Sequence, residues 1–364
     1  MNYKKLLVPM RWMVLLCFIF GSCKESTVEN QKDGIAIKLQ AGETQLSLVN
    51  DISLELPEAG PALGIIGSMA VLEDYIIVLD GLRRSIEVFD IAGNYKWSIG
   101  SRGNAKGKYK RPSRLAIINN DQMLIYDGGT GRILRFSIKG EFLGQLKLSE
   151  RRYINRMMVS EDQNFIHTYV DKDKNGMLCV TSLETGEDLA KFKVCDAQYM
   201  DLFLLLGRTQ GIAYNGKTKI IYFALPWEEK IMRIDLTTQD FLSPITLNHP
   251  KFIRFKMPDS KTQKELAADI HNFSRLNGMH LLSSGDMLLR YLFNDPSKST
   301  GLILLSNLSL QPLAQEVENE LGLYDVFSCY GMFVYRYLSP TDDEDTNGRI
   351  RVYRLSNSPE FPAE

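Results

Sequence analysis

The segment from Arg102 to Arg114 carries six cationic side chains and no acidic one, a composition suited to binding anions. Closely spaced Lys and Arg side chains bind phosphate groups, uronic acids or acidic protein surfaces. A solvated basic loop of a nearly neutral protein has the same composition, so both interpretations stay open. A Walker A phosphate loop is excluded, because Tyr109 stands where that motif requires Ser or Thr. The candidate ligand-binding residues are Arg102, Lys106, Lys108, Tyr109, Lys110, Arg111 and Arg114.

Two further segments have the spacing D-x-D-x-N-G, in which alternate side chains can converge on one calcium ion. The twelfth position holds Ser182 in one segment and Arg354 in the other, where an EF-hand requires a bidentate Glu. Asn-Gly is also a strong signal for a hairpin turn. We therefore expect two hairpin turns and no cofactor, with calcium binding as the alternative. The candidate metal ligands are Asp171, Asp173 and Asn175, and Asp343, Asp345 and Asn347.

The His and Cys residues form no recognisable catalytic or metal-binding motif. The four histidines include no HExxH pair, and the sequence contains no G-x-S-x-G nucleophile elbow. Cys179, Cys195 and Cys329 have no CxxC spacing and give no disulfide framework, although a Cys179–Cys195 bond stays open. A zinc site assembled from His167 and His280 is a further alternative, but packed histidines are the favoured interpretation.

The N-terminus has the organisation of a lipoprotein signal peptide. Lys4, Lys5 and Arg11 precede nine apolar residues, which are too few to span a bilayer. The segment then ends in Gly21-Ser22-Cys23, which resembles a bacterial lipobox. We predict a signal peptide over residues 1–22, lipid attachment at Cys23 and a flexible tether over residues 23–44. Lys24 is not the Asp that usually retains a lipoprotein in the inner membrane, so we expect the outer membrane.

A repeat with a fixed period organises the elements that position these residues. Five residues recur 47 positions later, namely Asp80, Ile86, Phe89, Gly93 and Tyr95 as Asp127, Ile133, Phe136, Gly140 and Phe142. A period of roughly 40–50 residues with several short strands is typical of a β-propeller blade. The sequence predicts six four-stranded blades at about 65–100, 112–148, 154–194, 210–247, 276–314 and 322–356.

The propeller is therefore expected over residues 45–356, with a C-terminal tail over residues 357–364. A helical insertion is predicted over residues 248–275, because Ser260-Lys261-Thr262-Gln263 resembles a capping box followed by apolar residues at helical spacing. At least one of the strand-like runs between residues 35 and 56 is expected to pair with C-terminal strands and close the ring. The net charge of −1 argues against a nucleic-acid-binding protein.

The repeat resembles the six-bladed β-propeller lipoproteins of Bacteroidota, which are similar in pattern to NHL-like and TolB-like propellers. The resemblance is carried by 86–90, Gly93, Ile99-Gly100 and the loop 103–109, although this loop lacks the usual Pro and has Lys108 where Glu is usual. It implies a fold and a location in the cell envelope more than an activity. We expect a non-catalytic module that binds a ligand or protein, with acidic glycans and envelope proteins as candidate partners. The alternative is an NHL-like metal-dependent lyase or hydrolase with its site in the central channel.

Overall fold

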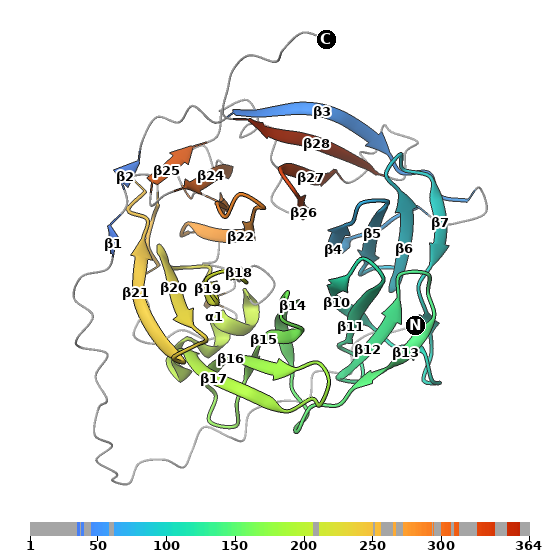
Figure 1. Ribbon diagram of the computed structural model, residues 1–364, viewed down its shortest axis with the longest axis horizontal. Helices are drawn as coiled ribbons and strands as arrows, with labels where there is room; N and C mark the ends of the chain where they lie inside the picture. The colour runs from blue at the N-terminus through green and yellow to red at the C-terminus, as the bar shows by residue number, and fades with distance from the viewer. Residues whose placement is uncertain are drawn as a thin grey trace. The chain divides into compact units, whose positions relative to one another are not determined.

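Most of the described strands belong to six sheets, or blades, which are arranged around a centre and whose consecutive strands are antiparallel (Figure 1). The computed structural model describes residues 35–36, 38–39, 45–57, 62–206, 211–249, 252–255, 265–266, 272–292, 294, 300–306, 309–312, 326–338 and 348–356. Among these residues, no helix has the length and apolar character needed to cross a membrane.

The first three blades are each built from four consecutive strands. Blade 1 consists of β4 (Ile66–Val71), β5 (Tyr75–Asp80), β6 (Ser85–Asp90) and β7 (Tyr95–Ser98). Blade 2 consists of β10 (Pro112–Asn119), β11 (Gln122–Asp127), β12 (Arg132–Ser137) and β13 (Phe142–Leu146). Blade 3 consists of β14 (Ile154–Val159), β15 (Asn164–Val170), β16 (Gly176–Ser182) and β17 (Asp188–Cys195).

The other three blades include strands from the N-terminal part of the chain. Blade 4 consists of β18 (Gly211–Asn215), β19 (Ile220–Ala224), β20 (Lys230–Asp235), β21 (Asp240–Thr246) and β1 (Ile35–Ala36). Blade 5 consists of β22 (Arg275–Leu281), β23 (Met287–Leu292), β24 (Thr300–Ser306), β25 (Ser309–Pro312) and β2 (Lys38–Leu39). Blade 6 consists of β26 (Val326–Tyr330), β27 (Phe333–Leu338), β28 (Arg349–Ser356) and β3 (Gln45–Ser53).

The first strands of the six blades form a closed inner ring. In order around the ring, β4, β10, β14, β18, β22 and β26 each contact the next, and β26 contacts β4. The ring is closed at blade 6, because β3 comes from the N-terminus and pairs antiparallel with β28. The expectation that an N-terminal strand closes the ring is therefore confirmed. In addition, β1 and β2 each pair in parallel with the outermost strand of blade 4 or blade 5, an arrangement that covers exposed sheet edges.

The hydrophobic core consists of six clusters, and each cluster joins two neighbouring blades. Successive side chains of a strand point to opposite faces, so β5 contributes to two of these clusters. Ile77 and Leu79 pack against blade 2, whereas Ile76 and Val78 pack against blade 6. A strand that is buried on both faces requires a continuous apolar run, as the sequence from Tyr75 to Leu79 predicts.

The repeated Asp and Gly of the sequence are both contact points between chain segments. The buried carboxylate of Asp80 accepts hydrogen bonds from the amides of Gly64, Leu82 and Arg83, which ties the connection before blade 1 to the β5–β6 turn. Gly93 has a positive φ of 94°, and a Cβ there would lie 2.1 Å from the carbonyl oxygen of Ser53 in blade 6. The repeat therefore preserves the residues that attach each blade to the chain beside it.

One helix was not predicted from the sequence. The helix α1 (Met200–Leu205) follows β17 and buries Met200, Leu202 and Phe203 in the cluster between blades 3 and 4. Six residues are too few to show helical periodicity, so no pattern indicated this helix. Of the predicted insertion, the segment 252–255 has no regular structure and Glu265 and Leu266 are helical, and much of the remainder lies outside the described residues.

Candidate functional site

The predicted basic loop lies at one end of blades 1 and 2. Because strands alternate in direction within a blade, the connection to the next blade and the turn between the second and third strands share one end of the sheet. We call it the connection end. The basic loop contains two short parallel strands, β8 (Ser101–Arg102) and β9 (Lys108–Tyr109). Asp127 accepts hydrogen bonds from the amides of Lys110 and Arg111 at 3.0 and 2.8 Å, which fixes the loop to blade 2.

Five of the seven predicted ligand-binding residues lie on the surface. Their side chains are exposed, and within the part of the chain that the structure describes none of them forms an ion pair: Arg102, Lys106, Lys108, Lys110 and Arg111. The ammonium group of Lys106 lies over the ring of Phe142, 5.8 Å from its centroid. The guanidinium of Arg132 donates a hydrogen bond to the carbonyl oxygen of Lys108 at 2.8 Å. The loop therefore presents several cations on a backbone that the neighbouring strands hold in place.

The other two predicted residues, Tyr109 and Arg114, are buried and hold the loop from inside. The hydroxyl of Tyr109 donates to the carbonyl oxygen of Ile99 at 2.8 Å, and burial raises the pKa of this phenol. The guanidinium of Arg114 donates through Nε to the carbonyl oxygen of Asn155 in blade 3 at 2.6 Å. Both side chains thus contact backbone rather than solvent, and their position in the interior could not be inferred from composition.

Burial would raise the pKa of Asp127, but hydrogen bonds from Thr130 and from the amides of Lys110 and Arg111 lower it below its usual value. The carboxylate is therefore ionised at neutral pH, and it also lies 3.5 Å from the guanidinium of Arg132. A charged acceptor strengthens each of these hydrogen bonds, which stabilises the conformation of the loop.

The first predicted calcium loop forms the hairpin turn between β15 and β16. The backbone amide of Asn175 donates a hydrogen bond to the Asp171 carboxylate at 2.7 Å, and Lys174 has a positive φ of 63°. No group of three or more His, Cys, Asp or Glu side chains suited to a metal occurs among the residues that the structure describes. Calcium binding by Asp171, Asp173 and Asn175 stays a prediction. The second set, Asp343, Asp345 and Asn347, lies outside the described residues.

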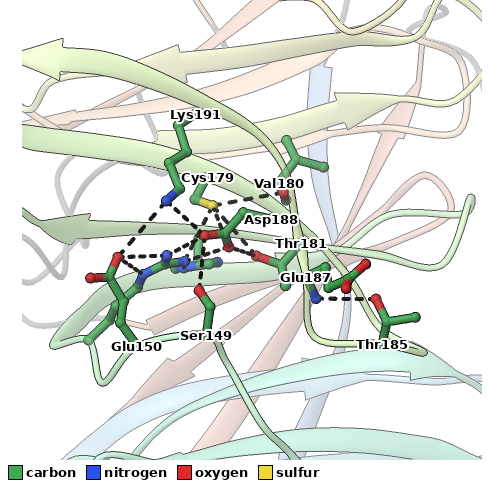
Figure 2. A network of polar contacts seen from close by, with 11 residues as sticks. Ser149, Glu150, Cys179, Val180, Thr181, Thr185, Glu187, Asp188 and Lys191 are labelled. Carbon is green, nitrogen blue, oxygen red and sulfur yellow. Dashed lines mark hydrogen bonds and ion pairs between the residues drawn. The ribbon is translucent and has the colours of Figure 1, made fainter.

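A buried polar network between blades 2 and 3 was not predicted (Figure 2). Its centre is Arg152, whose side chain is 1% exposed. The guanidinium bonds to both carboxylate oxygens of Asp188 and donates to Glu150 at 2.8 Å. It also lies over the ring of Tyr169, 4.3 Å from the centroid. Arg152 comes from the connection between the two blades, so the network attaches this connection to blade 3.

Two potentially reactive side chains, Cys179 and His167, belong to the same network. Arg152 Nη1 lies 3.3 Å from His167 Nε2 and 3.4 Å from Cys179 Sγ. The thiol of Cys179 donates to Asp188 at 3.2 Å, and burial raises its pKa to about 11. Burial and the charge of Arg152 lower the pKa of His167 to about 3. At neutral pH the thiol is protonated, and only a thiolate is an effective nucleophile.

The electrostatics of Asp188 explain why the network is stable at neutral pH. Burial would raise the pKa of this carboxyl group, but hydrogen bonds from Arg152, Lys191 and Cys179 lower it well below its usual range. Because His167 Nε2 faces a guanidinium, which only donates, the imidazole accepts through this nitrogen. The network therefore links two chain segments through charged hydrogen bonds, and the Asp188 carboxylate that accepts from the Cys179 thiol is itself held by Arg152 and Lys191.

The two histidines of the zinc alternative have different surroundings. His167 lies on β15 within the network around Arg152, whereas the neighbours of His280 on β22 are Arg156 and Arg290. Burial and these two cations lower the pKa of His280 to about 4, so both imidazoles are neutral at pH 7. The guanidinium of Arg152 beside His167, and the positive charges of Arg156 and Arg290 that act on His280, are unfavourable for a metal cation.

The closed ring of six antiparallel sheets defines a six-bladed β-propeller. The chain belongs to the DUF5128 family, described as a 6-bladed beta-propeller, whose family model matches residues 44–303. The fold expected from the repeat is thereby confirmed. No curated protein matches this sequence.

Three solved structures illustrate the similarity of fold. A protein from Bacteroides fragilis NCTC 9343, described as a presumed exported protein, is 14% identical over 88% of this chain and 99% of its own, with a TM-score of 0.64. A member of the duf4221 family from Bacteroides vulgatus is 10% identical over 88% and 100%, with a TM-score of 0.63. The PQQ-bound aldose sugar dehydrogenase from Streptomyces coelicolor is 12% identical over 86% and 98%, with a TM-score of 0.52. At these identities the likeness concerns the fold alone.

Proposed function

We propose that this protein is a non-catalytic binding module of the cell envelope, which holds an anionic partner at the connection end of blades 1 to 3. The observation that carries the proposal is the basic loop, whose exposed cations stand on a backbone fixed by Tyr109 and Asp127. A cationic surface that is held rigid before binding loses less conformational entropy when a ligand arrives. Such a surface therefore binds more tightly than the same charges on a mobile loop.

The distribution of charge along the blades supports an anionic partner. At the connection end of blades 1 to 3, the turns and connections carry mostly cations, including Arg84, Arg102, Lys106, Lys108, Lys110, Arg111, Arg151, Lys172 and Lys174. At the opposite end, the turns of the same blades carry mostly anions, including Glu73, Asp74, Asp121, Glu141, Glu161, Asp162, Glu184 and Glu187. Although the net charge is only −1, positive and negative charges are concentrated at opposite ends of blades 1 to 3, and this field attracts anions to the connection end.

Reversing three charges of the loop is expected to weaken the binding of anionic probes strongly without affecting the fold. The variant Lys106→Glu/Lys108→Glu/Lys110→Glu changes only exposed side chains. Each exposed charge contributes little alone, but the triple reversal should cost about 2–3 kcal/mol, on the order of a hundredfold in affinity. The measurement is titration with a polyuronate and a Glu-rich peptide at low and high salt, with circular dichroism to verify folding.

The matched control reverses three lysines outside the connection end, Lys96, Lys139 and Lys217, whose side chains are also exposed. We expect this control to bind the probes nearly as wild type, with the affinity falling as salt screens the charges. Equal losses in both variants, or binding that ignores both salt and the reversal, would show that the basic loop is only a solvated connection.

The location in the envelope is proposed from the N-terminal sequence, which lies outside the described residues. Cys23 follows a short apolar segment in a lipobox-like context, and a similar solved structure is of a protein described as presumed exported. The Cys23→Ala variant is expected to lose fatty-acid labelling and to leave the membrane fraction, because no other residue would carry the lipid. Labelling with an alkyne palmitate analogue and density-gradient fractionation measure both effects. Persistent labelling of the variant would refute lipid attachment at this residue.

A further inference from the structure

Three blades expose equivalent residues at the connection end. In each of blades 1, 2 and 3, the first strand pairs with the second strand, and a β-bulge follows the first residue pair. These first pairs are Ile66↔Asp80, Pro112↔Asp127 and Ile154↔Tyr169. The residues that precede these strands are therefore equivalent, and they are Ile65, Arg111 and Tyr153. All three are exposed, Ile65 at 65% and Tyr153 at 53%.

Leu82 extends this row into an apolar patch on blade 1. Its side chain is 67% exposed and lies beside the connection that carries Ile65, since the amide of Gly81 donates to the carbonyl oxygen of Ile65 at 2.8 Å. A Cβ added to Gly64 would lie 2.8 Å from Cβ of Leu82, so the turn and the connection are in close contact. We call Ile65, Leu82, Arg111 and Tyr153 the docking row.

The docking row is held rigid although its side chains are exposed. The Asp80 carboxylate accepts the amides of Gly64 and Leu82 at 2.6 and 2.9 Å, which fixes the backbone on both sides of Ile65 and Leu82. Asp127 fixes Arg111 in the same way. Tyr153 follows Arg152, whose buried guanidinium anchors the connection to blade 3. Large aliphatic side chains that are fixed in water gain free energy only when a partner covers them.

In blade 5 the equivalent position is covered by the chain itself. The first strand of blade 5 has its β-bulge after Leu276, as blade 1 has it after Ile66, so Arg275 is the equivalent of Ile65. The side chain of Arg275 is buried, with only 8% of the residue exposed. The preceding residue, Ser274, accepts hydrogen bonds from the amides of Ile253 and Asn294 at 2.9 and 3.1 Å. The connection between blades 4 and 5 therefore lies over the connection end of blade 5, whereas the docking row of blades 1 to 3 is uncovered among the described residues.

We propose that the partner of the connection end is a protein that presents an acidic segment with apolar side chains, and that the docking row receives the apolar side chains. This inference rests on the proposed function and specifies its ligand. Phosphates and uronic acids gain nothing from Ile65 and Leu82, whereas a protein segment buries them at a gain of roughly 25 cal/mol per Å². Arg and Tyr are also enriched in the energetically important centres of protein interfaces.

The surrounding cations supply the charge complementarity. Arg84 and Arg151 are exposed near the row, and the planar guanidinium of Arg111 can bind a carboxylate in a bidentate manner. A membrane surface is less well placed as the occupant. The described part of the chain begins at β1, on the outer edge of blade 4, which is three blades away from blade 1 in the ring.

The test compares two acidic peptides of equal charge, one alternating Glu with Leu and one alternating Glu with Ser. Wild-type protein is expected to bind the Glu–Leu peptide at least tenfold more tightly by fluorescence anisotropy. In the variant Ile65→Ser/Leu82→Ser/Tyr153→Ser this preference should disappear, while binding of the Glu–Ser peptide is unchanged. The matched control, Ile91→Ser/Leu143→Ser/Leu189→Ser, removes apolar side chains of similar exposure elsewhere and should keep the preference.

The outcomes separate the two proposals. If neither peptide binds, or if the triple lysine reversal leaves binding intact, the proposed function fails. If both peptides bind equally, or if the docking-row variant keeps the preference for leucine, only the protein partner is refuted. Binding to vesicles of anionic phospholipid that depends on the docking row and exceeds binding of the Glu–Leu peptide would assign the row to a membrane and also overturn the inference.

Discussion

Replacing Arg152 by Met is expected to lower the free energy of unfolding by roughly 3–5 kcal/mol, the usual cost of breaking a buried ion pair. Met keeps the apolar volume but cannot donate to Asp188, Glu150 or the acceptor nitrogen of His167. Asp188 is only 11% exposed, so its charge would lose the guanidinium that offsets its burial. The measurement is thermal and urea unfolding followed by circular dichroism.

The control for this prediction is Lys191→Met, which removes the other cation that contacts Asp188, at 2.9 Å. The side chain of Lys191 is 43% exposed, so solvent screens its charge, and its loss should cost less than about 1 kcal/mol. If the two variants unfold at the same temperature, the network around Arg152 does not brace blade 3. A loss of stability in Arg152→Met with unchanged near-ultraviolet spectra would place the effect in this network rather than in the whole core.

Removing β3 is expected to prevent formation of a closed propeller. A chain that begins at Leu54 lacks the fourth strand of blade 6, and with it Leu46 and Ile52, which are buried in the clusters on either side of that blade. Burying such a side chain contributes roughly 1.5–3 kcal/mol, and β28 would in addition have an unpaired edge along its whole length. We expect loss of the near-ultraviolet signal and of a cooperative thermal transition, together with aggregation on a sizing column.

A chain that begins at Gln45 is the appropriate comparison. It keeps β3 but lacks β1 and β2, each of which pairs through only two residues. This chain should retain a cooperative transition and the near-ultraviolet spectrum of the full-length protein. A cooperative, monomeric protein beginning at Leu54 would show instead that blade 6 is stable without its N-terminal strand.

The fold was accessible from the sequence because the repeat preserves contacts between blades. Asp80 and Asp127 recur since each fixes an inter-blade connection, and Gly93 recurs since the preceding blade approaches it closely. The continuous apolar run from Tyr75 to Leu79 predicted that neighbouring blades cover both faces of β5, although it did not say which residue faces which blade. The strand pairing of blades 1 and 2 thus follows from a local pattern that both blades repeat.

The site was less accessible, because its residues come together only through the register of distant strands. Arg152 and Asp188 are 36 residues apart, and no local spacing connects them. The repeat did contain one signal. Tyr169 of blade 3 stands at the position that Asp127 has in blade 2, so another group must hold the connection before blade 3. Lys108 is exposed and the adjacent Tyr109 is buried, a difference that counting the charges of the loop could not predict. The docking row becomes visible only when three blades are aligned.

The closure of the ring by β3 also determines the order in which the protein can be completed during synthesis. Asp51 of β3 pairs with Arg351 of β28, and the two residues are 300 positions apart. Ribosomes synthesise a chain from its N-terminus, so β3 is made well before β28, the strand with which it pairs. The entropic cost of joining such distant segments grows only slowly with length, but contacts of this range delay folding. The sixth blade, and with it the sealed ring, can therefore form only after β28 has emerged, 300 positions after β3.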